Sequence, residues 1–415
     1  MNSDSPSGTM PRLRIGVATG RLTTEPATVM SAIALAVANA GSVTRPELVR
    51  QTQLARATVD SNLNTLIRSG LLSPVGESRT SRYGRPAETI GLTWHDGVVL
   101  IVDLSPHHVR VVAADLSQRV CAQRSWDEDI KTGPEAVIEH VAARLEALLA
   151  ELPRAVPLAL VASIPGPVDI HRGVAVRPPI MPGWDEYPIR DALLERFGCP
   201  VFIDNDVNVM ALGESRALPS EELPLLVVKV GTGIGGGLVG SNGDVHRGAD
   251  GSAGDIGHLP VPGHDGIVCK CGNRDCVEAI ASLDAMARRL GESEDKTVTH
   301  LEFLERVRTG EGNATSLVRD AAAQIGDVVA MLVHVYNPAH ITIAGTITHA
   351  SDDLLAGVRS AVYRRALPLA TRNLIITHSV LQAESVVAGG LVLGIEMVLG
   401  PQQIFATLER ISSSA

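Results

Sequence analysis

The pattern of apolar residues changes near Gly97, and this change constrains the fold more than any other feature of the 415-residue chain. Before it, apolar residues recur at helical spacing in three short segments. After it, short apolar runs of the kind found in buried strands alternate with longer helical segments. Because strands that alternate with helices are typical of α/β folds, we expect a mainly helical N-terminal head on an α/β body.

The head has the signals of a winged helix-turn-helix. Thr44 and Glu47 form a capping box at the start of the second helix. A polar, arginine-rich loop over 78–86 precedes a strand over 87–92, and an extended segment begins at Leu71. Three helices followed by a two-strand ribbon predict this motif, with the helices over 27–39, 44–51 and 56–69.

The third helix of the head is expected to read DNA. Short polar side chains on its outer face fit a major groove, while arginines meet phosphates. Arg85, in a slim Gly-Arg-Pro segment, fits a narrow minor groove. Asp60 either accepts a hydrogen bond from cytosine or lies off the groove. The alternative is a winged helix used for protein contacts. The expected DNA contacts are Arg45, Arg56, Thr58, Ser61, Asn62, Thr65, Arg82 and Arg85.

Charge is distributed unevenly along the chain. Residues 1–90 hold 10 Arg and no Lys against 2 Asp and 4 Glu, so their net charge is 10 − 6 = +4. The whole chain carries −10, which leaves −14 for the rest. A basic head on an acidic body indicates a polyanion partner for the head alone, although a solvated basic face is the alternative.

Composition excludes several classes of protein. Apolar residues make up 45% and charged residues 20%, which is ordinary globular composition rather than that of a disordered or fibrous chain. The apolar windows near 225–240 and 391–404 are interrupted by charged residues, glycines or proline, so we expect no membrane span. The first residues lack the apolar region of a secretory signal, so we expect a cytoplasmic protein.

Three of the five cysteines lie within eight residues, and a histidine precedes them. One imidazole and three thiolates make a closed tetrahedral zinc site of structural type. The alternative is a group of free thiols. The expected Zn²⁺ ligands are His258, Cys269, Cys271 and Cys276. Cys121 and Cys199 stand alone among apolar residues, and we expect them in the core.

Two further motifs indicate a ligand cleft. Gly231–Gly237 joins two apolar strands, and such a loop can cradle a phosphate with its backbone N–H groups. Asn205 and Asp206 follow a buried strand, where polar side chains of an α/β sheet project into the ligand crevice. Both can bind a polyol, and Asp206 can act as a general base. The alternative for this motif is an Asx-rich turn.

These residues resemble the ROK family, which comprises repressors, unassigned reading frames and sugar kinases. The resemblance runs from about residue 27 to 400 and is most specific over Gly231–Glu278. It implies a two-lobed sugar-kinase-like body of the actin-like ATPase/ribonuclease H-like class. Further matching motifs are Pro165-Gly166-Pro167-Val168-Asp169, Pro182-Gly183-Trp184, Asn205-Asp206-x-Asn208, Gly254-Asp255-Ile256-Gly257-His258 and Asn337-Pro338.

Carried over position by position, the resemblance implies a sugar site in the cleft. His258 would bind zinc through one ring nitrogen and meet a sugar hydroxyl through the other. In family kinases the residue that matches Asp206 is the catalytic base. The implied sugar ligands are Gly166, Asn205, Asp206, Asp255, His258 and Glu278.

The chain departs from the kinase pattern at three places. The family's first phosphate loop, Asp-x-Gly-Gly-Thr, is here Asp103-Leu-Ser-Pro-His-His108, which has no glycine. The usual Glu of the Glu-x-Gly-His segment is Asp255, and an adenosine-side Gly-Gly is Gly345-Thr346. Because phosphoryl transfer depends on positioning and charge neutralisation of the nucleotide, we expect no enzyme activity and a vestigial base at Asp206.

The expected organisation is a flexible arm over 1–25, a winged helix-turn-helix over 26–94, a small lobe over 95–210 and a large lobe over 211–415. The last of these holds the zinc site, and its C-terminal helix packs back on the small lobe. We expect a DNA-binding regulator, a repressor of sugar-metabolism genes, that senses a sugar or sugar phosphate as a homodimer or dimer of dimers. The alternatives are an ATP-dependent sugar kinase with a DNA-binding head and a regulator without an effector.

Overall fold

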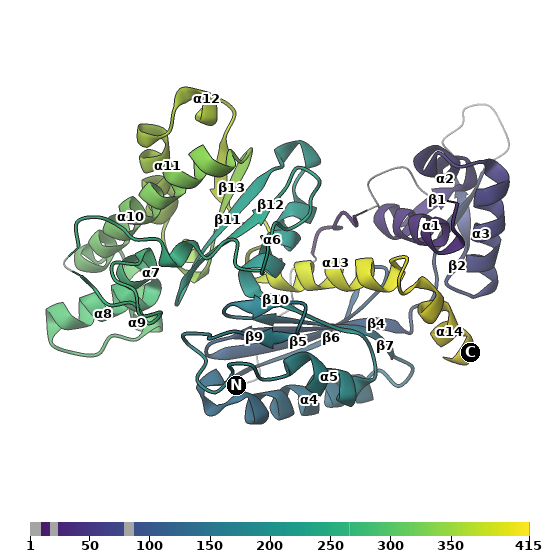
Figure 1. Ribbon diagram of the computed structural model, residues 1–415, viewed down its shortest axis with the longest axis horizontal. Helices are drawn as coiled ribbons and strands as arrows, with labels where there is room; N and C mark the ends of the chain where they lie inside the picture. Colours follow the sequence, from purple (N-terminus) through teal and green to yellow (C-terminus); the bar gives the residue numbers. More distant parts are fainter. Residues whose placement is uncertain (1–9, 17–23, 79–86, 265, 415) are drawn as a thin grey trace.

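The computed structural model describes residues 10–16, 24–78, 87–264 and 266–414 (Figure 1). A small helical head lies at one end of the molecule, and two α/β parts follow it. The long helix α13, Ser385–Leu399, runs over the first of these parts toward the head. The mainly helical head and α/β body expected from the sequence are therefore both present.

Local signals place the helices of the head. Its helices are α1 Pro26–Ala40, α2 Arg45–Thr52 and α3 Arg56–Arg68, and Thr44 caps α2 in a full capping box with Glu47. Gly41 ends α1 with φ of 81°, a conformation that favours glycine. The ribbon has three strands instead of the expected two, because β1 Ser42–Thr44 adds to β3 Ala87–Leu92, which pairs with β2 Leu72–Ser78.

The first α/β part contains a five-stranded sheet in the order β10-β7-β4-β5-β6. Helices α4 Pro134–Ala150 and α5 Ile189–Phe197 cover one face, and α13 covers the other (Figure 1). Edge strand β6 was not expected, since its side chains are only partly buried. The strands are β4 Gly97–Ser105, β5 His108–Asp115, β6 Val120–Asp127, β7 Val156–Ile164 and β10 Val201–Asn205, with a small β8–β9 pair, Val168–Asp169 and Val174–Ala175.

The second part has a four-stranded sheet in the order β12-β11-β13-β14, made of β11 Leu225–Val230, β12 Ile234–Val239, β13 His340–Ala344 and β14 Ile375–His378. Helix α6 Asp206–Ala217 packs against β11 and β12. The remaining helices are α7 Val277–Ala281, α8 Leu283–Glu294, α9 His300–Arg308, α10 Gly312–Tyr336, α11 Asp353–Arg365, α12 Pro368–Thr371 and α14 Ile404–Ser414. Short 3₁₀ turns are Ile130–Thr132, Ser220–Glu222, Ile256–His258, Thr346–His349 and Gln382–Glu384.

Helices α6 and α13 cross at glycines. A Cβ on Gly389 would lie 1.8 Å from the carbonyl oxygen of Val209, and one on Gly213 would lie 2.2 Å from that of Ser385. Any side chain there would push the two helices apart. The lobe boundary expected between residues 210 and 211 falls inside α6, which packs against both α13 and the second sheet.

One segment among the described residues, Gln382–Leu399, is long and apolar enough to cross a membrane. Two thirds of it, 67%, is buried inside the protein. The segment is apolar because it packs in the protein core between the first sheet and α6.

The head and the body share one hydrophobic core. It joins side chains of α1 and α3 to those of β4, α13 and α14. Residues 10–16 of the expected flexible arm are part of this core, since Leu13 and Ile15 are only 1% and 3% exposed. The arm prediction is therefore wrong for residues 10–16, because alternate apolar side chains of that short segment find a buried groove. We call residues 10–16 the strap.

Candidate ligand cleft, metal centre and DNA-binding surface

The six residues expected to bind a sugar all line one cleft between the two α/β parts, here called the ligand cleft. Gly166 follows β7, and Asn205 and Asp206 lie where β10 passes into α6. The other three come from the second part, at the turn Ile256–His258 and on α7. The parallel pairing of β7 with β10 places their carboxyl ends side by side, which is where ligands bind in open α/β sheets.

Asn205 is the N-cap of α6. Its Oδ1 accepts a hydrogen bond from the backbone N–H of Val207 at 2.9 Å, and its Nδ2 donates to the carbonyl of Gly166 at 2.9 Å. Asn205 therefore forms the Asx-type cap that was the alternative for this motif, and it also lines the ligand cleft. Its side chain fixes Gly166 and the first turn of α6, and with it Asp206, at the wall of the cleft.

Lys229 is a cleft residue that the sequence analysis missed. It lies on β11, and its ammonium forms an ion pair with Oδ2 of Asp206. Burial lowers the pKa of Lys229, but the Asp206 carboxylate outweighs this, and the pKa is raised overall. The Asp206 carboxylate therefore favours the charged form of Lys229. In the sequence, the only signal was a lysine inside an apolar strand.

Glu278 and Gly233 are positioned together. Oε2 of Glu278 accepts a hydrogen bond from the backbone N–H of Ile234 at 3.0 Å. A Cβ on Gly233 would lie 2.5 Å from the same oxygen, so glycine lets the carboxylate reach the backbone. Asp255 lines the same cleft despite its short side chain, and burial raises its pKa.

Most glycines of the 231–237 run have a packing role. The turn itself comprises only Gly231, Thr232 and Gly233, while the later glycines belong to β12. A Cβ on Gly235 would lie 2.7 Å from Val207, and one on Gly237 would lie 2.4 Å from Ala211. Those glycines let α6 lie directly on the sheet. This packing explains why the run contains more glycines than a turn alone requires.

The segment 103–108, all of it described, is a tight hairpin. Strands β4 and β5 pair as far as Ser105 with His108, so only Pro106 and His107 form the turn. The carbonyl of His107 accepts from the N–H of Glu128 at 3.1 Å, and that of Pro106 from Ile130 at 3.4 Å. This segment therefore lacks the open, glycine-rich form of a loop whose N–H groups surround a phosphate.

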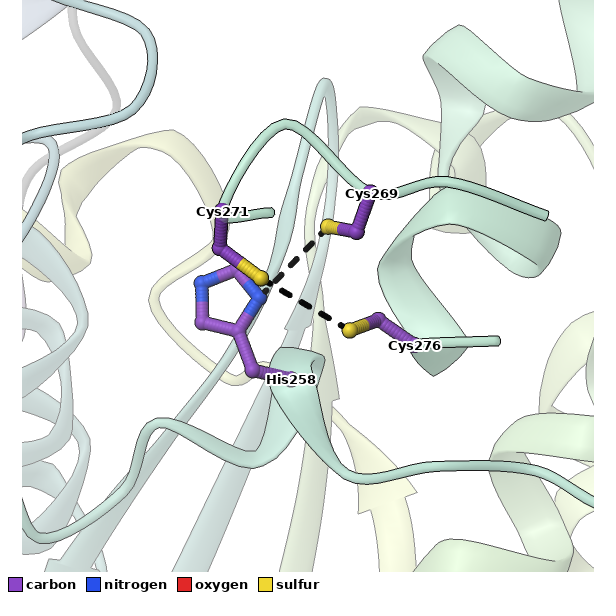
Figure 2. A group of neighbouring side chains, drawn as sticks. All are labelled: His258, Cys269, Cys271 and Cys276. Atoms are coloured by element: carbon purple, nitrogen blue, oxygen red, sulfur yellow. Dashed lines mark hydrogen bonds between the residues drawn. The ribbon is translucent and has the colours of Figure 1, made fainter. Parts of the chain in front are cut away.

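The four expected metal ligands gather as predicted. Figure 2 shows the three sulfurs and the His258 ring pointing toward one another, and their ligand atoms all lie within 4.8 Å. The Sγ atoms of Cys271 and Cys276 are 3.8 Å apart, and Cys269 Sγ lies 3.7 Å from His258 Nδ1. A tetrahedral zinc site with bonds of about 2.3 Å places its sulfurs about 3.8 Å apart, so this donor set fits zinc.

The loop that carries the cysteines is shaped for a metal. Gly272 adopts φ of 92° in the turn where the N–H of Cys269 donates to Asn273 at 2.8 Å. Burial raises the pKa of the Cys276 thiol to about 12, so a cation must displace its proton before it can act as a thiolate ligand. His258 turns Nδ1 toward the sulfurs while its side chain also lines the ligand cleft.

The outer face of α3 is polar. Val59, Leu63 and Leu66 are buried, and Ser61, Asn64 and Arg68 are exposed on the opposite side of the helix. Asn64 was not among the expected contacts. It follows Ser61 by three residues, a spacing that places both on one face of a helix and could have identified it. We call Ser61, Asn64 and Arg68 the α3 outer face.

The other expected DNA contacts lie around this face. The Arg45 guanidinium donates a hydrogen bond to the Asp60 carboxylate at 3.1 Å. The acidic residue of α3 therefore holds Arg45 in position beside the helix. Arg56 is exposed, and Thr58 and Asn62 are partly buried beside the face. Thr65 lines a shallow hollow shared with α14. Arg82 and Arg85 lie outside the described residues.

The isolated cysteines differ in their surroundings. Cys199 is fully buried, as expected, and burial raises its pKa to about 11. Cys121, on edge strand β6, is only partly buried, so the core prediction is wrong for that residue.

Comparison with known proteins places this architecture. The model of the ROK family matches residues 99–396. The chain is 29% identical over 345 residues to a putative xylose repressor of Caldicellulosiruptor sp. strain Rt8B.4, covering 78% of this chain and 84% of that one. It is 28% identical over 361 residues to the Escherichia coli K12 DNA-binding transcriptional dual regulator NagC, covering 84% and 87%. A glucokinase of Halalkalibacterium halodurans is 33% identical over 201 residues, which covers 45% of this chain and 61% of that one.

A solved structure shows the same fold over nearly the whole molecule. The crystal structure of a ROK family transcriptional regulator, described as a homologue of the E. coli MLC protein, superposes with a TM-score of 0.77 at 19% identity. It covers 93% of this chain and 98% of that one, so the match includes the head. The family model alone spans well over half of the sequence. The chain therefore belongs to the ROK family.

Proposed function

We propose that this protein is a DNA-binding transcriptional regulator that represses sugar-metabolism genes in the cytoplasm and senses a sugar in its ligand cleft. The observation that carries the proposal is the hydrophobic core that the helix-turn-helix head shares with the body. The cleft of that body is lined by all six residues expected to bind a sugar. Relatives named as a putative xylose repressor and an N-acetylglucosamine repressor match along most of the chain and support it.

Two features of the cleft argue against phosphoryl transfer. The hairpin at Pro106 and His107 replaces an open phosphate loop. The Lys229 ammonium occupies an oxygen of Asp206, so that oxygen is not free to accept a hydroxyl proton. A kinase needs both a positioned nucleotide and an available base.

A coupled assay with ATP and glucose, glucosamine or N-acetylglucosamine tests this point. We expect no sugar-dependent ADP production above that of a sample without protein, because the segment 103–108 has no open phosphate loop and Lys229 is paired with one oxygen of Asp206. ADP production that the substitution Asp206→Asn abolishes would instead establish the sugar kinase.

The metal at His258 and the three cysteines is proposed to be structural zinc. All four ligand positions are filled by side chains, which suits a closed site rather than a catalytic one. His258 also lines the cleft, and Cys276 directly precedes α7, which carries Glu278. When bound, zinc would fix the orientation of both ligand-binding residues.

Helix α6 is the proposed connection between cleft and head. Asp206 begins it at the cleft, and Arg216 near its end pairs with Glu396 of α13 at 3.0 Å. Glu396 also accepts the N–H of Gly16 in the strap at 2.6 Å. Arg12, at the other end of the strap, donates to the last carbonyls of α1 in the head. A ligand that moves α6 would therefore move the head.

An apolar surface on α10, α11 and α12 is proposed to join two copies of the chain. Val335, Tyr363 and Leu369 are 85%, 52% and 78% exposed, and a two-fold contact would remove these apolar side chains from water. A regulator that reads paired half-sites needs such a two-fold contact. We expect Leu369→Asp to shift the protein from dimer to monomer in sedimentation equilibrium, with Leu194→Asp on α5 as the control. Equal masses for the two variants would contradict this surface.

Capture of genomic DNA fragments, repeated with candidate sugars, tests the whole proposal. We expect enrichment of a common sequence that a sugar abolishes or weakens. On the captured operator, Asn64→Ala should cost about 1–3 kcal/mol of binding, since one base contact is worth that much. Asn373→Ala, an exposed change far from the head, is the matched control. Equal affinities of the two variants would remove Asn64 from the interface.

A further inference from the structure

A second cleft opens directly beside the ligand cleft. The two clefts are adjacent, because they share six lining residues: Pro106, Pro179, Ile180, Thr232, Gly233 and Glu278. The volume of the second cleft is about 670 Å³, more than the ligand cleft offers. A molecule bound at Glu278 can therefore extend into it.

The walls of the second cleft suit the apolar faces of a sugar ring. The segment 178–182 supplies prolines and Ile180 on one side, and Ile267 and Val268 of the metal loop face it. Val268 is 63% exposed, although it is large and apolar. The rings of His107 and His300, one from each α/β part, have centroids 6.3 Å apart in this cleft. Flat apolar surfaces and rings of this kind pack against C–H groups of ligands.

The polar groups of the second cleft suit the hydroxyls of a sugar. Asp284 accepts from Lys270 at 2.9 Å and lies 3.3 Å from His300 Nε2. These hydrogen bonds, led by His300, hold the pKa of Asp284 well below its usual range against the effect of partial burial. The second cleft is lined by acceptors, the carboxylates of Asp284 and Glu278, and by donors, the side chains of Lys131, Lys270 and Arg288. A sugar hydroxyl both donates and accepts hydrogen bonds, so it can pair with groups of either kind.

We propose that the second cleft is a subsite for a second sugar unit, so that the effector is a disaccharide or a larger glycoside. This inference rests on the proposed sugar-sensing function. It also gives the altered hairpin a role, because Pro106 lines both clefts and His107 lines the second. The residues that close the former phosphate loop thus form a wall of the effector site.

Calorimetric titration of the full chain with matched sugars tests the subsite. The pairs are glucose with cellobiose and with maltose, xylose with xylobiose, and N-acetylglucosamine with diacetylchitobiose; ATP is a separate probe. We expect one disaccharide to bind at least about tenfold more tightly than its own monosaccharide. His107→Ala should weaken that disaccharide roughly two- to tenfold and leave the monosaccharide unchanged. His108→Ala, the exposed neighbour that lines neither cleft, is the control.

The outcomes separate this inference from the proposed function. Equal affinity within every pair that binds would overturn the subsite and leave sugar sensing intact. Binding of ATP in place of a disaccharide, weakened by His107→Ala, would assign the second cleft to a nucleotide and overturn the subsite. If no sugar of either size binds, the sensing function itself fails, and the subsite fails with it.

Discussion

Replacing Cys276 with serine is expected to remove the metal, destabilise the second α/β part and abolish the response to sugar together. Cys276 is fully buried and directly precedes α7, where Glu278 lines both clefts. A structural zinc site contributes to the folding free energy outright. We therefore expect the free energy of unfolding to fall by more than about 4 kcal/mol, which is exceptional for one substitution.

Metal content, thermal unfolding and the sugar-induced shift in melting temperature are the three measurements. Cys121→Ser is the matched control, because Cys121 is partly exposed on edge strand β6, away from the cluster. It should keep the metal and the sugar response. Retention of one zinc per chain in the Cys276 variant would contradict the ligand assignment. Loss of zinc with a normal sugar response would show that the metal does not order the cleft.

Replacing Leu13 with aspartate is expected to release the strap and so uncouple the head from the ligand cleft, while α1 stays packed on α13 and α14. Leu13 is 1% exposed, and its backbone pairs with the side-chain amide of Gln118 through hydrogen bonds of 2.8 and 3.0 Å. A carboxylate buried among apolar side chains would lose its hydration, so the strap must leave or the core must open. We expect a loss of about 3 kcal/mol or more of stability. Operator binding should survive without its sensitivity to sugar.

Denaturant unfolding and operator titration with and without the sugar measure these two effects. Leu194→Asp makes the same chemical change at a position on α5 that is 43% exposed. It should alter stability by no more than about 0.5 kcal/mol and keep the sugar response. If the Leu13 variant keeps the full response of operator binding to sugar, the signal does not pass through the strap.

Features that depend on neighbouring residues in sequence were predictable. The capping box at Thr44, the glycine that ends α1 and the close spacing of the cysteines are all written in short segments, and the structure confirms each of them. The six cleft residues were named by motif. Parallel strands that end at one edge of the sheet bring Gly166, Asn205 and Asp206 together, and the second α/β part supplies the other three.

Features that depend on distant partners were not predictable. The strap is short and contains two arginines, and its burial requires Gln118 and Glu396, far away in the chain. The ion pair of Lys229 with Asp206 joins two motifs that sequence alone keeps apart. Edge strand β6 is only partly buried, so it lacks the apolar run that marks the other strands of its sheet.

The common core of head and body has a practical consequence for protein engineering. Most side chains of α1 are buried, partly by α13 and α14 from the far end of the chain. A fragment that stops after residue 94 would expose that helix to water and aggregate. Chimeras that exchange operator specificity between relatives must therefore move α1, the strap and the two last helices as one set, or exchange only the α3 outer face.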